Sequence, residues 1–189
     1  MEETLQIGYT WPSATTLGPG HRFVVWVQGC ERRCPGCASP DLQPLYGGKL
    51  VAVSSLSREI LETSGIDGIT ISGGEPLLQW RPLAVLLEDV KSKCPELTVI
   101  LFTGYRRENI SEEVASCLLP FIDLLVDGEY IRELNDNRGL RGSSNQRLHF
   151  LSDALINHKE TLLDGPRRRE SHLIGPREVL TIGIAPGRN

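Results

Sequence analysis

Three cysteines lie close together in the stretch VQGCERRCPGC, at Cys30, Cys34 and Cys37. Thiolates bind zinc or iron–sulfur clusters, whose metals prefer tetrahedral sulfur surroundings. A structural zinc site usually needs four ligands, but the next thiol, Cys94, lies far along the chain, and the spacing of His21 matches no common zinc module. A 4Fe–4S cluster on three cysteines would keep one iron open to a small molecule. The spacing therefore favours the cluster, with zinc and a redox or incidental thiol group as alternatives.

A second motif, SGGEP, occupies residues 72–76 directly after an apolar run. Its two glycines allow close approach of the backbone to a ligand, and the Glu75 carboxylate can accept hydrogen bonds from an ammonium group. The alternative is a tight turn from a strand into a helix, with Pro76 at the first helical position. The presence of the cysteine motif in the same chain favours the ligand site.

Together the two motifs resemble the radical S-adenosylmethionine (SAM) enzymes, which have a Cys-x3-Cys-x2-Cys loop and a Gly-Gly-Glu loop. The resemblance implies that Cys30, Cys34 and Cys37 hold a 4Fe–4S cluster whose fourth iron is chelated by SAM. It also implies that the loop 73–75, Gly73–Gly74–Glu75, binds the amino group of SAM. Reductive cleavage of SAM would then yield a 5′-deoxyadenosyl radical that abstracts a hydrogen atom.

Further motifs are similar to those of one group within the radical SAM enzymes. Many radical SAM enzymes carry an aromatic residue just before the third cysteine, where this chain has Gly36. The resulting CPGC is similar to the activating enzymes of anaerobic ribonucleotide reductase, as are GPG, TGY, LLVDGEY and RGSSNQR at 18–20, 103–105, 124–130 and 141–147. This resemblance covers residues 17–150. It implies a glycyl radical enzyme as protein partner, an electron donor such as flavodoxin or ferredoxin, and a partial (β/α)6 barrel.

Apolar runs rich in Val, Ile and Leu predict strands at 22–28, 68–72, 97–103 and 121–127, and helical periodicity predicts helices at 54–65, 77–93, 109–119 and 151–163. We expect Pro82 to interrupt the second helix early, and Asn109 and Glu112 have the spacing of a capping box at the start of the third. A hairpin is predicted over 171–186.

The alternation of strands and helices predicts an α/β fold with a mainly parallel sheet covered by helices. We expect one domain of residues 1–189, with a core at 17–150 and a short C-terminal extension at 151–189. In such sheets ligands bind beyond the carboxyl ends of the strands. Ser72 and Thr103 are predicted at this rim, beside the cysteine and Gly-Gly-Glu loops.

Several other polar residues have two interpretations. Hydroxyls and amides in GSSNQ (142–146) can bind a ribose or an adenine edge or can cap their own turn, and the resemblance favours a SAM-side or substrate-side role for Ser143 and Asn145. Asp127 can bind a cation or cap a turn. Cys94 and Cys117 are expected to be buried small apolar residues.

The totals set limits on the remaining possibilities. A formal net charge of −4 and a pI near 5.6 give no reason to expect nucleic-acid binding. No apolar run reaches the ~18–20 residues of a membrane span, and the N-terminus has no signal-peptide pattern, so a cytoplasmic protein without membrane contact is expected. Two alternative functions stay open: a radical SAM enzyme that modifies a small molecule or a ribosomally made peptide, and a non-enzymatic zinc- or cluster-binding adaptor.

Overall fold

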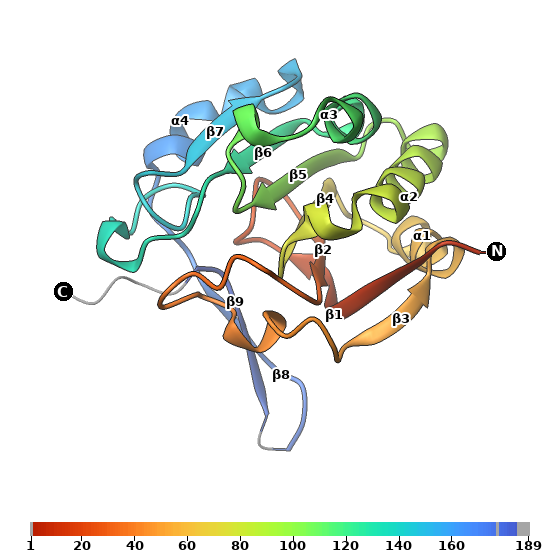
Figure 1. The fold of residues 1–189 in the computed structure, drawn as a ribbon, viewed down its shortest axis with the longest axis horizontal. Coiled ribbons are helices and arrows are strands. Elements are labelled where there is room, and N and C mark those ends of the chain that lie inside the picture. Colours follow the sequence, from red (N-terminus) through yellow and green to blue (C-terminus); the bar gives the residue numbers. More distant parts are fainter. Residues whose placement is uncertain (1, 177, 185–189) are drawn as a thin grey trace.

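A computed structural model describes residues 2–176 and 178–184 of the chain (Figure 1). Its strands are β1 (Thr4–Ala14), β2 (Arg22–Val27), β3 (Lys49–Ala52), β4 (Gly68–Gly73), β5 (Thr98–Thr103), β6 (Leu124–Asp127), β7 (Arg147–Phe150), β8 (Glu170–Leu173) and β9 (Val179–Ile182). Its α-helices are α1 (Val53–Glu62), α2 (Trp80–Lys93), α3 (Glu112–Leu118) and α4 (Lys159–Asp164). No helix among these residues is both long and apolar enough to cross a membrane.

The central sheet has seven strands in the order β3-β1-β2-β4-β5-β6-β7. The four middle strands, β2, β4, β5 and β6, are parallel, whereas β1, β3 and β7 pair antiparallel at the two sides. This confirms the mixed α/β class with a mostly parallel centre. A (β/α)6 barrel is not confirmed, because no pairing joins the outer strands β3 and β7 among the described residues.

The side chains of each strand alternate between two covered faces of the sheet. In β2, Phe23 and Val25 belong to the core beneath α1 and α2, whereas Val24 belongs to a separate cluster with Leu17 and Ile182. Helices α1, α2 and α3 cover the first face, and α4 lies on the other side of the sheet near β7 (Figure 1). Because both faces are covered, the middle strands consist mainly of apolar residues, as the sequence pattern predicts.

Some predicted boundaries were wrong. Helix α3 begins at Glu112 with Ser111 as its N-cap, not with Asn109, because residues 107–109 form a separate 3-10 turn. Helix α2 begins only at Trp80, so Pro82 lies in its first turn, where its missing N–H costs little, and does not interrupt it. The segment predicted as a helix at 151–163 divides into a 3-10 helix over 153–158 and α4.

The C-terminal hairpin is confirmed as β8 and β9, which pair antiparallel. Residues 177, 185 and 186 of the predicted hairpin lie outside the described residues. Strands β1, β3 and β7 were not predicted. Strand β1 contains Gly8 and Pro12, and β7 has only four residues, so neither has the long apolar pattern that marks β2 or β5.

Arg22 is a fully buried cation at the start of β2. Its guanidinium donates to Thr70 Oγ1, the Ile69 carbonyl, and the carbonyl and hydroxyl of Thr98, at 2.6–3.0 Å. Burial lowers the pKa of Arg22 to about 10, which leaves it charged at neutral pH. The residue therefore joins the amino ends of β2, β4 and β5, opposite the rim where ligands are expected.

We predict that Arg22→Met lowers the free energy of unfolding by about 3 kcal/mol, because it leaves several buried oxygen acceptors without a donor. Urea denaturation measures the change. Arg58→Met on the exposed side of α1 is the matched control and should change the free energy by less than about 0.5 kcal/mol. An Arg22→Met variant as stable as the control would contradict the structural role of this arginine.

Candidate cluster and SAM site

The loop that carries Cys30, Cys34 and Cys37, called the cysteine loop, follows β2 and contains a tight turn. The backbone N–H of Cys37 donates to the carbonyl of Cys34 at 3.2 Å. Gly36, between them, has φ of 68°, and Pro35 precedes it, which is the residue order of a type II turn. The turn brings Cys34 and Cys37 to the same loop end. Gly36 is thus required by the local backbone, which explains the absence of an aromatic residue at this position.

The start of this loop is held by the segment that follows the loop. The N–H groups of Gly29 and Cys30 donate to the carbonyls of Leu42 and Gln43, each at 2.9 Å. The side-chain amide of Gln28 donates to the carbonyl of Pro44 at 2.8 Å. The loop is irregular, but its base is thereby fastened to residues 42–44.

The cysteine thiols lie in a partly buried, weakly negative environment. Burial raises the pKa of Cys30, and although the backbone N–H groups of Arg32 and Arg33 lower it, Glu75 and Cys37 add to the rise. Burial also raises the pKa of Cys34, against the effect of the backbone N–H of Tyr130. The raised pKa values mean that the Cys30 and Cys34 thiols hold their protons more firmly than free cysteine. A bound cation supplies the positive charge that removes these protons, so metal binding here releases them.

The loop 72–76 packs directly on the cysteine loop. The N–H of Gly74 donates to the carbonyl of Val27, and the N–H of Glu75 donates to the carbonyl of Gly29, both at 2.8 Å. A Cβ atom at Gly74 would collide with the Gly29 carbonyl oxygen, so only glycine allows this approach. The two loops are brought together by the parallel pairing of β2 and β4, in which Val27 lies beside Gly73.

Glu75 is buried, with 1% of its surface exposed, and both its oxygens accept hydrogen bonds. One accepts from the Leu77 N–H at 3.0 Å and the Thr103 hydroxyl at 2.8 Å, and the other accepts from the Gly104 N–H at 2.8 Å. Burial raises the pKa of Glu75 despite these donors. Glu75 therefore joins the ends of β4 and β5 and caps the turn at 76–79.

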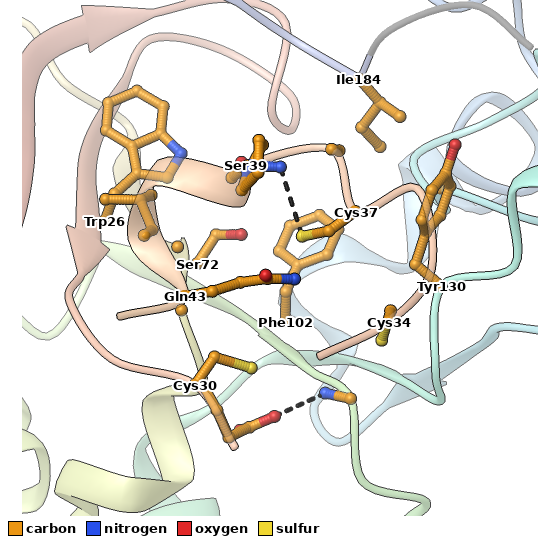
Figure 2. A pocket seen from close by; sticks show the side chains of 18 of the residues that line it. Trp26, Cys30, Cys34, Cys37, Ser39, Gln43, Ser72, Phe102, Tyr130 and Ile184 are labelled. Carbon is orange, nitrogen blue, oxygen red and sulfur yellow. Dashed lines mark hydrogen bonds between the residues drawn. The ribbon is translucent and has the colours of Figure 1, made fainter. Parts of the chain in front are cut away.

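These loops surround one cavity of about 400 Å³ (Figure 2). Its polar wall contains the three cysteines, Ser72, the loop 73–75, Thr103 and Gly104. Trp26 and Phe102 give it an apolar wall, and Tyr130 and Ile184 also border it. The size is within the range of small-molecule sites, and the mixture of a few polar groups with apolar walls is typical of them.

Ser143 and Asn145 do not border this cavity among the described residues. The hydroxyl of Ser143 is buried and accepts from the Ile131 N–H at 3.1 Å, and the amide of Asn145 donates to the Glu129 carbonyl at 2.8 Å. The neighbouring Gln146 does border the cavity and donates to the Gly128 carbonyl at 2.6 Å. The segment 142–146 thus fastens residues 128–131, which carry Tyr130 into the site.

Arg32 connects the cysteine loop to two other loops, a role that the sequence did not indicate. Its guanidinium lies 5.0 Å from the centre of the Tyr105 ring and 3.5 Å from the carboxylate of Glu129. Its charge also opposes the rise in the pKa of Glu75. A cation over an aromatic face is favourable, so Arg32 stabilises the closed arrangement of the three loops.

The donor set suits a cluster better than a single ion. Among the described residues, no group of three His, Cys, Asp or Glu side chains is placed to hold one metal ion. In a cluster each cysteine binds a different iron, so its sulfurs stand further apart than the ligands of one ion. His21 precedes β2 whereas Cys30 follows it, and six strand residues separate their ends by about 20 Å. His21 therefore cannot complete a zinc site with the cysteines.

Comparison with known proteins agrees with this geometry. The family model of the 4Fe-4S single cluster domain matches residues 16–149. The anaerobic ribonucleoside-triphosphate reductase-activating protein of Enterobacteria phage T4 is 32% identical over 152 residues, which cover 78% of this chain and 96% of that protein. The proteins of the same name from Vibrio cholerae and Escherichia coli K12 are 34% and 28% identical, over 74% and 75% of this chain. The chain belongs to this family of activating proteins.

The region matched by the 4Fe-4S domain model contains every strand of the central sheet except β1 and the last residue of β7. It also contains both loops of the site. The family match ends before the hairpin of β8 and β9, although Leu180, Thr181, Gly183 and Ile184 border the cavity. The resemblance could not predict that contribution, because it ended at residue 150.

Asp127 is a fully buried carboxylate at the end of β6. It accepts from the guanidinium of Arg147 through both oxygens, at 3.0 and 2.5 Å, and from the Arg107 N–H at 2.6 Å. His149 Nε2 lies 3.0 Å from the same carboxylate. These contacts match the turn-capping interpretation and add an ion pair. Asp127 holds the beginning of the segment 128–131 that carries Tyr130.

Other expectations require correction. Cys94 packs against the core as expected, whereas Cys117 is exposed on α3 and is not a buried apolar residue. Neither lies at the cavity. Arg167, in a segment without a sequence motif, is half-buried and donates to Asn135 and to the carbonyls of Arg138 and Arg141. Side-chain burial of this kind depends on packing between distant segments.

The Asp127 ion pair predicts a pH dependence of stability. Burial alone raises the pKa of Asp127, but the hydrogen bonds from Arg147 and Arg107, with the nearby His149, outweigh it, and the net shift is downward. A carboxyl group with a lowered pKa in the folded state stabilises the protein above its unfolded pKa, and this contribution is lost as the pH falls through the folded pKa.

We therefore expect Asp127→Asn to lower the free energy of unfolding by about 2 kcal/mol at pH 7. The difference from the wild type should narrow as the pH falls below about 4, because the unfolded carboxyl then binds a proton and the folded carboxyl follows as the pH falls through its lowered pKa. Urea denaturation at several pH values measures both effects. Exposed Asp153→Asn is the control and should show neither. A difference that stays constant with pH would contradict the ion pair's contribution.

Proposed function

We propose that this protein is a radical SAM activase that generates a glycyl radical on a partner resembling anaerobic ribonucleoside-triphosphate reductase. The observation that carries the proposal is the meeting of the cysteine loop and the loop 72–76 at one cavity, in a chain of the activating-protein family. The partner follows from the name that the relatives share.

In this proposal Cys30, Cys34 and Cys37 hold a 4Fe–4S cluster, and SAM occupies the remaining cavity. A reduced cluster bound there would supply the electron for the cleavage of SAM to methionine and a 5′-deoxyadenosyl radical. This radical would take a hydrogen atom from a backbone glycine of the partner, giving 5′-deoxyadenosine and a glycyl radical. The backbone of Gly73 and Gly74 and the Glu75 carboxylate face the ammonium group of SAM, and Ser72 and Thr103 border it. Trp26 and Phe102 exclude water from the apolar side.

Three further residues support this site indirectly. Ser143 and Asn145 hold the segment 128–131 through Ile131 N–H and the Glu129 carbonyl, so we assign them to the positioning of Tyr130. In the same way Arg32 holds the cysteine loop against Tyr105 and Glu129. These residues affect SAM through the loops that they fasten.

The wider setting completes the proposal. We place the protein in the cytoplasm, where its five unpaired cysteines stay reduced, and expect flavodoxin or ferredoxin as electron donor. We also propose a single domain whose sheet corresponds to the partial (β/α)6 barrel of radical SAM enzymes. The continuous seven-stranded sheet supports one domain.

One observation favours a second candidate function. The cavity is also bordered by residues beyond the family match, namely Leu180, Thr181, Gly183 and Ile184. An altered wall can accept a different substrate, so a radical SAM enzyme acting on a small molecule or a ribosomally made peptide is the alternative. Stimulation of SAM cleavage by such a peptide, without any glycyl radical on a reductase, would support it. A zinc-binding adaptor has no such support, because His21 lies at the wrong end of β2.

The central prediction concerns Cys34. After anaerobic reconstitution, the wild type should bind about four irons and, with a reductant, release 5′-deoxyadenosine. Cys34→Ala should lose the cluster and reduce SAM cleavage by at least about 100-fold, because a metal-ligating thiolate is removed. Iron and sulfide analysis and product chromatography measure both.

Cys117→Ala is the matched control, since Cys117 is an exposed thiol on α3 outside the cavity, and it should behave as the wild type. Unchanged turnover in Cys34→Ala, or equal loss in Cys117→Ala, would refute the assignment. Electron paramagnetic resonance on a co-expressed reductase then tests the activase step, where a glycyl radical doublet is expected.

A further inference from the structure

The hairpin of β8 and β9 is an addition to the family's shared core. The phage T4 relative aligns over 96% of its own length but only 78% of this chain, and the family match stops at residue 149. The hairpin, between residues 170 and 182, lies entirely beyond this family match.

The inner face of the hairpin is fixed to the body of the protein. Ile182 is buried and Leu180 packs beside it, in a cluster with Leu17 and Val24 from the β1–β2 region. The carboxylate of Glu170 accepts from the Thr15 hydroxyl at 2.9 Å. The base of the hairpin is thus packed against the body of the protein, whereas the rest of the hairpin extends away from it (Figure 1).

The outer face of the same hairpin is apolar and exposed. Leu173 and Val179 are cross-strand partners, with 78% and 58% of their surfaces exposed. Residues two apart in a strand share a face, so Thr181 lies on the face of Val179, and its hydroxyl lies 3.1 Å from that of Ser171. Thr181 borders the cavity. An exposed apolar surface therefore begins about 7 Å from the site and runs outward from it.

We propose that this outer face, Leu173 and Val179, is a docking surface for the protein whose glycine is the substrate. The inference rests on the proposed function. A SAM-sized ligand fills the cavity itself, whereas only a macromolecule reaches both the cavity and a surface outside it. Exposed apolar residues that continue a binding site mark contact surfaces, and their burial against an apolar patch of the partner drives association. The partner's glycine-bearing segment then passes Thr181 and Ile184 into the cavity.

The test uses reconstituted full-length protein and a purified anaerobic ribonucleoside-triphosphate reductase from the same organism. Leu173→Lys and Val179→Lys should each weaken reductase binding about tenfold, because a charge would be buried at the contact. Both should keep wild-type iron content and wild-type SAM cleavage without the reductase, since the two side chains lie outside the cavity. Binding is measured by biolayer interferometry and activation by the yield of glycyl radical against reductase concentration.

Val85→Lys is the matched control, because Val85 is an exposed apolar residue, at 42%, on helix α2, which covers the other face of the sheet. It should bind the reductase within twofold of the wild type. Wild-type binding by both hairpin variants, or equal loss in the control, would overturn the docking surface alone. A wild type that cleaves SAM but neither binds nor activates the reductase would overturn the proposed function as well.

Discussion

The close contact between the backbones of Gly74 and Gly29 is the constraint on which the site depends. Two hydrogen bonds of 2.8 Å join residues 74 and 75 to the carbonyls of Val27 and Gly29. They extend the parallel pairing of β2 and β4 beyond the ends of both strands. The cysteine loop and the Gly-Gly-Glu loop, which come from distant parts of the sequence, are therefore held at a fixed separation by the sheet itself.

Around this contact the structure repeats one arrangement, in which a buried polar side chain joins neighbouring strand ends. Glu75 joins β4 to β5 at the rim, and Asp127 with Arg147 joins β6 to β7. Arg22 does the same at the opposite ends of the strands. Each of these charges is compensated by several hydrogen bonds, as burial requires. The loops between the strands can then be irregular and still hold their side chains in place.

The phage T4 relative has a shorter chain than this protein. The shared core supplies the cysteines and the Gly-Gly-Glu loop, whereas the added hairpin supplies one wall of the cavity and an apolar surface beside it. In the proposed function, the core generates the radical and the hairpin determines which partner can approach it. Chemistry demands a conserved arrangement of a few atoms, but recognition of a partner depends on the shape and polarity of a surface.

The sequence alone determined the middle strands, the CPGC turn and the two loops, because each depends on local chemistry: apolar runs for buried strands, Pro35 and Gly36 for the turn, thiols for metal. Only the tertiary structure decided which distant residues meet. The structure shows that Ser143 and Asn145 bind the backbone of residues 129–131 and do not border the cavity, and that Arg32 lies over the ring of Tyr105. It also shows that Leu180, Thr181, Gly183 and Ile184 border the cavity. Such contacts depend on packing between segments far apart in the chain, which no local pattern of residues encodes.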